Sequence, residues 1–493
     1  MVTTGFVHHH GRIANLIRDI IARLCFAESK RTDPTSPKGL FVKRRTFLQT
    51  AAASSAALSL APYVHASGSR AVPKVGLIGS GWYGKCDTLQ LLNVADVEIV
   101  SVCDVDSKMA AQAAELLGSR QKSRNVPKVY EDYRQQLKDH EHDIVVIGTP
   151  DHWHSLPMIA AVEAGADVYC QKPTGCDVLE SKAMLDAARK HNRVVQIGTQ
   201  RRSTPHLMEA KRKVVDAGLL GDVAHVEVCC YYHMRNNKTI EQAPDKPAPD
   251  HINWDLYTGP APMRGFNDIV HPRGWRAFME YCNGIMGDMC VHMLDTTRWM
   301  LDLGWPSRIS SAGGILVDTD ARANITDTQT ATFHYDDLNV VWTHRSWGHA
   351  SNKDFPWAAI IYGDKGTLKL SVNKYEFEPR GKGEKLSGDA VIEVDKYPTD
   401  KEDKAKWSLE LHVASAIRGH MQDFLKSVED RSKPIADIEQ GHISSASCIL
   451  ANVAMEVGKT LDWDPASHRV TNSDDANAKL KRDWREPYVH PGA

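Results

Sequence analysis

The sequence predicts an α/β fold in which a domain with a parallel sheet precedes a domain with a large, mostly antiparallel sheet. Three observations support this prediction. Strand-like and helix-like segments alternate from residue 72 to 198, a glycine-rich turn follows the first of these strands, and strand-like runs joined by turns occupy much of the chain after residue 225. Strands that alternate with helices form doubly wound parallel sheets, whereas consecutive strands pair in antiparallel fashion.

Length and composition fit two folded domains. The chain has 493 residues, of which 42% are hydrophobic and 25% charged, with a formal net charge of −2. Because binding to a polyanion needs a concentrated basic face, we expect no nucleic-acid partner. The 10 cysteines form no C-x-x-C pair, so buried free thiols are expected rather than disulfides or a metal site.

The first 66 residues have the pattern of an export signal. Arg44 and Arg45 precede an apolar, alanine-rich run over residues 51–62, and a small-x-small site ends at Ala66. This order is typical of a twin-arginine signal peptide, and the apolar run is too short to span a bilayer. The alternative is a buried alanine-rich helix behind two surface arginines. We expect residues 1–66 to be a leader recognised by the twin-arginine export machinery, and the mature protein to be periplasmic or exported without a membrane anchor.

A glycine-rich turn separates the first strand from the first helix of the alternating region. Residues 74–78 form an apolar run, Gly79-Ser80-Gly81-Trp82-Tyr83-Gly84 follows, and a helix-like stretch continues to Leu92. In this setting the G-x-G-x-x-G pattern is typical of a Rossmann dinucleotide-binding domain. The first glycine permits the tight turn, the second lets backbone amides approach a diphosphate, and the third lets helix pack on strand. We expect the six residues of this turn to bind the cofactor.

Asp104 lies 20 residues after Gly84, where a second strand-like run ends. A carboxylate at this position accepts hydrogen bonds from the ribose hydroxyls of NAD and repels a 2′-phosphate. The two residues that follow, Val105 and Asp106, do not offer the arginine expected for NADP. We therefore expect NAD, with NADP as the alternative; an ordinary loop acid is the structural interpretation of Asp104.

The later strands of this domain also end in polar side chains. Further strand-like runs occupy residues 143–147, 167–170 and 194–197, and the domain closes near residue 198. Ligands of doubly wound sheets bind outside the carboxyl ends of the strands. The residues that follow these ends, and that we expect to contact the cofactor, are Thr149, His154, Gln171, Lys172 and Gln200.

The second domain is predicted over residues 199–464, with a polar tail over 465–493. One face of its sheet is expected to cover the cofactor or a partner subunit, which favours a homo-oligomer, either a dimer or a tetramer. The strand-like runs are residues 226–228, 330–334, 340–343, 358–362 and 367–370.

An acid–base pair is predicted on a helix over residues 286–303. Asp288 and His292 are at i and i+4, so they share a helix face. A surface or structural pair is the commoner interpretation of this pattern. An enzyme that transfers hydride must also remove the alcohol proton, and a histidine oriented by a carboxylate suits that step. Lys172 would polarise the same oxygen.

Trp275 and Arg276 precede this helix and are candidate substrate ligands by stacking and hydrogen bonding. A surface Trp-Arg pair is the alternative. The preceding loops, residues 236–273, are rich in proline and charge, and their periodicity does not indicate which substrate would bind.

These motifs in combination resemble the glucose–fructose oxidoreductase/inositol dehydrogenase/rhizopine-catabolism (Gfo/Idh/MocA) family. The resemblance runs from about residue 72 to 464 and rests on the glycine turn, Asp104, residues 148–154, Gln171-Lys172-Pro173 and the segment from Gly287 to Asp295. It implies a Rossmann domain, an α/β domain that often forms oligomers, and NAD(P)-dependent chemistry on sugars or polyols. The family's Glu-Lys-Pro lysine corresponds to Lys172, but Gln171 stands where the glutamate is usual.

The sequence therefore predicts an exported NAD(P)-dependent oxidoreductase that transfers hydride to or from a sugar or polyol. Lys172, Asp288 and His292 are the predicted catalytic residues, and Asp288 and His292 also face the substrate. Export favours a tightly held cofactor that is recycled on the enzyme, because no free nicotinamide pool is expected outside the cytoplasm. Two alternatives remain: redox-neutral glycoside cleavage or epimerisation through a transient keto-sugar, and a non-catalytic protein that binds a sugar or nucleotide.

Overall fold

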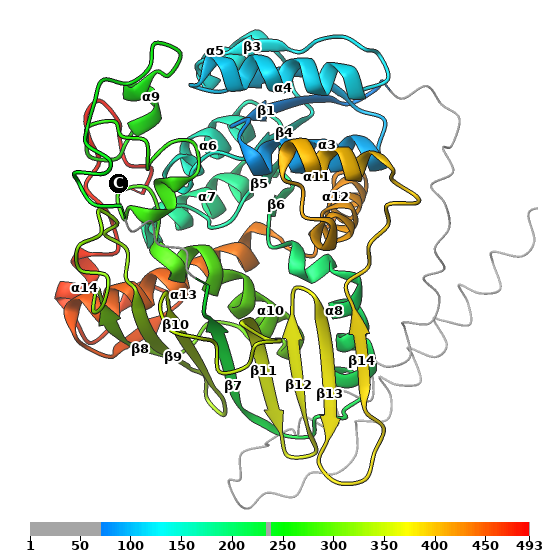
Figure 1. The fold of residues 1–493 in the computed structure, drawn as a ribbon, viewed down its shortest axis with the longest axis vertical. Helices are drawn as coiled ribbons and strands as arrows, with labels where there is room; N and C mark the ends of the chain where they lie inside the picture. Colours follow the sequence, from blue (N-terminus) through cyan, green and yellow to red (C-terminus); the bar gives the residue numbers. More distant parts are fainter. Residues whose placement is uncertain (1–70, 233–237, 493) are drawn as a thin grey trace, which may run out of the picture. The chain divides into compact units, whose positions relative to one another are not determined.

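The computed structural model describes residues 71–232 and 238–492 (Figure 1). The predicted leader and twin-arginine signal over residues 1–66 lie outside the described residues. In the part of the chain that the model describes, no helix is both long and apolar enough to cross a membrane.

The first domain contains the predicted parallel sheet. Its six strands have the order β3-β2-β1-β4-β5-β6, and every neighbouring pair is parallel. The order reverses between β1 and β4, which places a ligand-binding crevice at the carboxyl ends of these two strands. The strands are β1 (Lys74–Ile78), β2 (Glu98–Cys103), β3 (Lys128–Tyr130), β4 (Ile144–Ile147), β5 (Asp167–Cys170) and β6 (Val195–Ile197).

Helices cover both faces of this sheet, as buried parallel strands require. Apolar side chains of β1, β2 and β4 pack in one cluster with residues of α4, and side chains of β4, β5 and β6 pack in another with residues of α6 and α7. The elements are α3 (Trp82–Val94), α4 (Ser107–Arg120), α5 (Tyr133–Asp139), η1 (Asp151–Trp153), α6 (Ser155–Glu163), α7 (Val178–Lys190) and η2 (Gln200–Ser203).

The second sheet has ten strands in the order β14-β13-β12-β11-β7-β10-β9-β8-β15-β16. Its pairs are antiparallel except for β7 and β10, which run parallel, so the predicted fold class is confirmed. All five predicted runs lie within strands of this sheet. The strands are β7 (Val223–Cys230), β8 (Arg308–Gly314), β9 (Thr328–His334), β10 (Asn339–Arg345), β11 (Trp357–Gly363), β12 (Gly366–Ser371), β13 (Lys374–Pro379), β14 (Leu386–Asp389), β15 (Leu461–Asp464) and β16 (Arg469–Val470).

The largest hydrophobic cluster joins one face of this sheet to the helices α10 and α13. Along β9 and β10, buried residues alternate with partly or fully exposed ones, so the opposite face is open in the chain described. The helical elements here are α8 (Pro205–Ala210), η3 (Lys211–Val215), α9 (Trp254–Thr258), η4 (Gly274–Ala277), η5 (Met286–Cys290), α10 (Val291–Leu301), α11 (Thr399–Trp407), α12 (Leu411–Asp430), α13 (Ile438–Val457) and α14 (Asp474–Ala478).

Helices α11 and α12 return to the first domain, where they lie beside α3 (Figure 1). Val413, Ile417, Met421 and Phe424 of α12 pack in the same cluster as β1, β2 and β4. The Rossmann core therefore includes residues more than 200 positions beyond the end of the alternating region, which a reading along the chain does not reveal.

The C-terminal tail packs against both domains. Arg482 donates to the carbonyls of Met279 and Cys282, and His490 lies 2.8 Å from the Asp177 carboxylate. The predicted buried thiols are confirmed for the nine cysteines of the described residues.

Candidate active site

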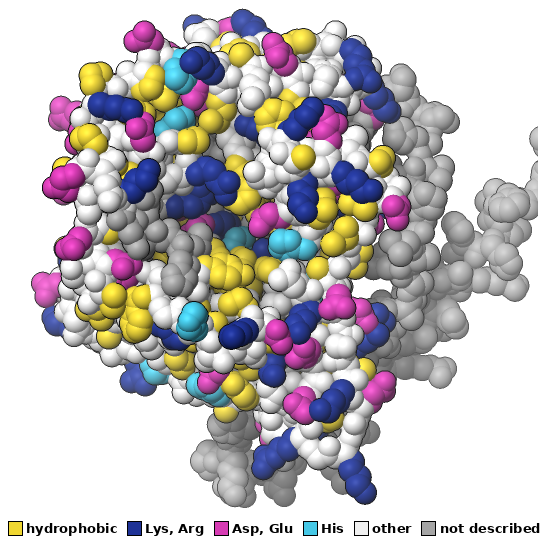
Figure 2. All heavy atoms as spheres, in the orientation of Figure 1, with side chains coloured by type: hydrophobic (Ala, Val, Ile, Leu, Met, Phe, Trp, Pro, Cys, Tyr) yellow, Lys and Arg dark blue, Asp and Glu magenta, His cyan; other side chains and the backbone are white. Residues whose placement is uncertain are grey.

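A cavity of about 810 Å³ opens at the carboxyl ends of β1, β2, β4 and β5. In the view of Figure 2, the hollow at the centre is edged by lysine, arginine and histidine side chains. Three residues of the predicted site do not line the cavity, namely Ser80, Gly84 and Gln200. The predicted residues that do are Gly79, Gly81, Trp82, Tyr83, Asp104, Thr149, His154, Gln171, Lys172, Trp275, Arg276, Asp288 and His292.

The glycine turn has the geometry that a dinucleotide needs. Gly79 has a φ of +83°, and a Cβ on Gly84 would lie 2.0 Å from the Gly79 carbonyl oxygen. A Cβ on Gly81, by contrast, would meet no described atom within 4 Å. Among the residues that the structure describes, no side chain caps the N-terminus of α3, so its free N–H groups and this open space fit a diphosphate. Ser80 and Gly84 do not line the cavity but shape the turn: Ser80 donates to Asp104, and Gly84 lies against the Gly79 carbonyl.

Asp104 holds the turn at the adenosine end of the cavity. Its carboxylate accepts hydrogen bonds from the Ser80 amide at 2.8 Å and the Ser80 hydroxyl at 2.9 Å, and from the Asp106 amide at 3.0 Å. Burial raises the pKa of Asp104, although these hydrogen bonds oppose the rise. Arg134 also lines the cavity, but its guanidinium is paired with Asp132. This arrangement favours ribose hydroxyls over a 2′-phosphate.

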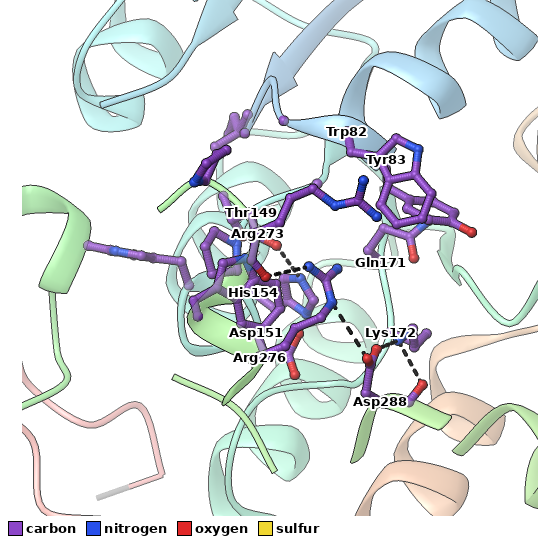
Figure 3. A pocket seen from close by; sticks show the side chains of 18 of the residues that line it. Trp82, Tyr83, Thr149, Asp151, His154, Gln171, Lys172, Arg273, Arg276 and Asp288 are labelled. Atoms are coloured by element: carbon purple, nitrogen blue, oxygen red, sulfur yellow. Dashed lines mark hydrogen bonds and ion pairs between the residues drawn. The ribbon is translucent and has the colours of Figure 1, made fainter. Parts of the chain in front are cut away.

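Lys172, Asp288 and Arg276 form a charged network at the other end of the cavity (Figure 3). The Lys172 ammonium donates to the Asp288 carboxylate at 2.6 Å and to its backbone carbonyl at 3.0 Å, and Arg276 Nε lies 3.6 Å from the second carboxylate oxygen. Burial alone would raise the pKa of Asp288, but Lys172 and Arg276 outweigh it and hold this pKa below its usual value. The third N–H of Lys172 remains available for a ligand.

His292 also faces the cavity, but Asp288 does not orient it. Neither ring nitrogen of His292 has a hydrogen-bond partner among the described residues, and Nδ1 is buried. Residues 286–290 form a π-helix that precedes α10 rather than the first turn of one α-helix, and the Asp288 carboxylate points to Lys172. The prediction that the carboxylate orients the histidine is therefore wrong. Burial, and then the charges of Lys172 and Arg201, lower the pKa of His292 well below its usual value, which keeps the ring neutral.

His154 serves the loop geometry rather than presenting a free nitrogen. Its Nδ1 lies 2.7 Å from the Pro173 carbonyl and its Nε2 lies 3.0 Å from the Thr149 carbonyl. The ring thus joins the loops after β4 and β5 and holds the carbonyl of Pro173, the residue after Lys172. Burial lowers the pKa of His154 to about 4, so the neutral ring donates to one of these carbonyls.

Gln171 has a structural partner that explains its amide. Its Nε2 donates to the Asp87 carboxylate of α3 at 2.6 Å, and burial raises the pKa of Asp87 to about 7. A glutamate at position 171 would set two buried carboxyl groups against each other. The amide therefore donates to one oxygen of Asp87, while Lys172 is paired with Asp288.

Trp275 lines the cavity but is 5% exposed and belongs to the hydrophobic core. The Arg276 guanidinium stacks on its ring, with Cζ 4.1 Å from the centroid. Trp275 thus supports Arg276, which is the residue of the pair that reaches Asp288.

Asp151 is a further cavity residue, in the segment 148–154 that carried the resemblance. Its side chain is 4% exposed and has no hydrogen-bond partner among the described residues. Burial raises the pKa of Asp151 to about 7, with Lys172 opposing the rise. A carboxyl group that changes protonation near neutral pH therefore faces the same cavity as His292.

Several cavity residues escaped the sequence analysis. Gln200 was predicted, but its neighbour Arg201 is the residue that lines the cavity. The doubled arginine a few residues after the end of β6 was the available signal. Other lining residues that were not predicted come from segments far apart in the chain, among them Tyr232, Trp357, Glu410 and His412.

Three family models match the chain in consecutive segments. An oxidoreductase-family NAD-binding Rossmann fold matches residues 73–199, a GFO/IDH/MocA C-terminal domain matches 251–369, and an oxidoreductase-family C-terminal α/β domain matches 395–490. Together they cover well over half of the chain.

Curated relatives match over shorter stretches. The chain is 31% identical over 153 residues to the inositol 2-dehydrogenase/D-chiro-inositol 3-dehydrogenase of Lactiplantibacillus plantarum, covering 30% of this chain and 41% of that protein. It is 27% identical over 240 residues to the levoglucosan dehydrogenase of Pseudarthrobacter phenanthrenivorans, covering 46% of this chain and 50% of that protein. The matched segments thus span half or less of the length of these relatives.

Among solved structures, the aldose-aldose oxidoreductase of Caulobacter crescentus, complexed with glycerol, superposes with a TM-score of 0.58. The match covers 80% of this chain and 100% of that one at 15% identity, so it supports the fold. The consecutive family matches, the glycine turn and the sheet order agree: the chain belongs to the Gfo/Idh/MocA family, and its first domain is an NAD-binding Rossmann domain.

Proposed function

We propose that the protein is an exported, NAD-dependent oxidoreductase that acts on a hydroxyl-bearing carbon of a sugar or polyol. The observation that carries this proposal is the convergence of a neutral, unpartnered His292 and a Lys172 with a free N–H on one cavity that begins at the glycine turn. The named activities of the curated relatives, on inositol and levoglucosan, support the substrate class.

The chain's own residues divide the work at the reacting carbon. The turn 79–84 and Asp104 hold the cofactor, which supplies the hydride acceptor and donor when bound. Neutral His292 accepts the hydroxyl proton as the hydride leaves that carbon. Lys172, held in place by the carboxylate and carbonyl of Asp288, donates its third N–H to the same oxygen and stabilises the developing charge. Asp288 is thus the positioning residue for Lys172.

The cofactor is retained between turnovers in this proposal. Contacts from the second half of the chain close over the start of α3: Trp82 Nε1 donates to the Ser408 carbonyl at 2.9 Å, and the Tyr83 hydroxyl donates to Glu410 at 2.9 Å. The Arg273 guanidinium lies 3.7 Å from the Trp82 ring centroid. A diphosphate at this helix start leaves only when these contacts open, so the hydride taken from one sugar is returned to another carbonyl on the same enzyme.

The first experiment is to purify the protein without added nucleotide, denature it and quantify released NAD(H) and NADP(H). Near-stoichiometric NAD(H) is expected. A protein that is empty and binds neither nucleotide in titration contradicts the proposal, whereas an empty protein that does bind contradicts retention alone. Turnover is then measured with pairs of sugars and no added NAD. Export is tested separately, by locating the full chain and a variant with Arg44 and Arg45 changed to lysine.

A second candidate is redox-neutral cleavage of a glycoside. Oxidation of a hydroxyl to a ketone acidifies the neighbouring C–H, so that a base removes this proton, the aglycone leaves with a proton, water adds, and the ketone is reduced again. The observation that favours it is Asp151, a buried, unpartnered carboxyl group whose pKa is raised by burial to about 7. Asp151→Asn separates the candidates: it stops release of p-nitrophenol from p-nitrophenyl glycosides in the redox-neutral case, and leaves sugar oxidation in place otherwise.

A further inference from the structure

Arg201 is a buried cation that the fold leaves without a partner. It lies in η2, the short helix that follows β6, lines the cavity and is 3% exposed. Its guanidinium makes no hydrogen bond or ion pair with any described residue, and Nε and Nη1 are both buried. The Trp357 ring lies beside it, 5.3 Å from Cζ to the centroid. An unpaired charge in such a place is costly unless a ligand completes it.

The next residue, Arg202, is a buried guanidinium with a structural role. Arg202 is also buried, but it forms two hydrogen bonds of 2.8 Å with the Asp295 carboxylate and donates to the Ile435 carbonyl. Two adjacent arginines thus have opposite environments. Arg202 is paired within the protein, while Arg201 has no hydrogen bond or ion pair with the described residues and faces the cavity.

The position of Arg201 separates it from the phosphates of the cofactor. Its strand, β6, lies three places from β1 and four places from β2 in the sheet order. At about 4.8 Å per strand, these separations are roughly 14 and 19 Å. The diphosphate and the adenosine ribose belong to β1 and β2, so the backbone of Arg201 lies toward the substrate end; its guanidinium acts on His292 there and is also within electrostatic range of Glu410 and Tyr83. There Trp357 also contacts His292, with ring centroids 5.6 Å apart.

We propose that Arg201 binds a carboxylate of the substrate, so that the enzyme acts on an acidic sugar or polyol, such as a uronate or an aldonate. This inference rests on the proposed function and narrows its substrate class. Lys172 and Arg276 share the single carboxylate of Asp288, whereas Arg201 has no ion pair with any described residue, so its guanidinium is available to a singly charged group. The planar fork of arginine matches a carboxylate in two hydrogen bonds. Trp357 excludes water from one face of the pair.

The test compares acids with their neutral counterparts on the holoenzyme at constant ionic strength. The pairs are D-glucuronate with D-glucose, D-galacturonate with D-galactose and D-gluconate with D-glucitol, and binding is measured by calorimetry. For at least one pair, the acid is expected to bind about 10- to 100-fold more tightly, the range of a charge-assisted hydrogen bond in a buried site. Arg201→Gln is expected to bring this ratio close to one, whereas Arg212→Gln, which removes an exposed arginine, keeps the wild-type ratio.

Three outcomes overturn the inference: no acid is preferred in the wild-type protein, Arg201→Gln leaves the preference intact, or D-glucose 6-phosphate binds more tightly than every acid. If Arg201→Gln does not fold, Arg201→Lys is used, which keeps the charge but not the fork and is expected to lower the ratio part of the way. Reduction of the bound cofactor, followed by absorbance, distinguishes failure of the proposed function from failure of this inference. Acids that bind preferentially without reducing the cofactor refute the proposed function alone; neutral sugars that reduce it while acids bind no better refute this inference alone.

Discussion

At the adenosine end of the cavity, one continuous stretch of chain from Gly79 to Gly84 supplies the turn, and Asp104 follows on the next strand. At the substrate end, Lys172, Arg201, Arg276, Asp288 and His292 come from separate loops and helices of both domains. The first end works through backbone shape, and the second through side chains whose partners are set by tertiary packing. We therefore expect cofactor binding at the glycine turn to be lost most easily by adding atoms, and activity at the substrate end to be lost most easily by removing side chains.

The largest effect is expected at the substrate end. His292→Ala removes the proposed proton acceptor and should lower turnover by about 10²- to 10⁴-fold, the usual contribution of general acid–base catalysis. Cofactor content measured after denaturation should stay near the wild-type value, because the glycine turn is untouched. His225→Ala, at an exposed position of β7, is the control. Normal turnover by His292→Ala would refute the catalytic assignment.

The adenosine end should respond to added atoms. In Gly84→Ala, the new Cβ would lie 2.0 Å from the Gly79 carbonyl oxygen, a backbone atom that has no room to move. We expect a loss of roughly 1–3 kcal/mol of stability, as for overpacking in a core, together with loss of bound cofactor. Gly81→Ala is the matched variant, since its Cβ meets no atom of the described chain within 4 Å. It should keep its melting temperature yet bind NAD more weakly, because the methyl group fills the space for the diphosphate. Equal melting temperatures for the two variants would contradict this difference.

The same contrast explains which features the sequence could predict. The glycine spacing and the strand–helix alternation are local, so the parallel sheet, its turn and Asp104 follow from residues close together in the chain. The i, i+4 spacing of Asp288 and His292 predicted a shared face only for an α-helix. Because residues 286–290 form a π-helical turn and Asp288 pairs with Lys172, the Asp288 carboxylate contacts Lys172 instead of His292. Arg201 and Trp357 become neighbours through packing between domains, which no spacing in the sequence records.

Asp87 links the two ends, because it lies on α3 and accepts a hydrogen bond from Gln171, next to Lys172. Its pKa rises from 3.8 to about 7 through burial, so the folded state binds a proton that the unfolded chain releases above pH 4. This penalty is absent below the unfolded pKa, grows between pH 4 and 7 and is complete above pH 7. Asp87→Asn should therefore raise the melting temperature at pH 8 by several degrees and have less effect at pH 5. Asp186→Asn, at an exposed aspartate, controls for the change in net charge, and a gain that is equal at both pH values would contradict the assignment.

The smallest expected effect tests whether the contacts over α3 retain the cofactor. Trp82→Phe removes the hydrogen bond from Nε1 to the Ser408 carbonyl and leaves an aromatic face for Arg273. One such bond contributes about 1 kcal/mol, so NAD should dissociate roughly 5-fold faster, measured as loss of bound cofactor during dilution. Trp347→Phe is the matched control, since that indole donates one hydrogen bond to Thr328 away from the cavity. The two substitutions remove the same kind of hydrogen bond. If NAD dissociated equally faster from both variants, the effect would come from lowered stability of the fold. The contacts over the glycine turn would then have no part in holding the cofactor.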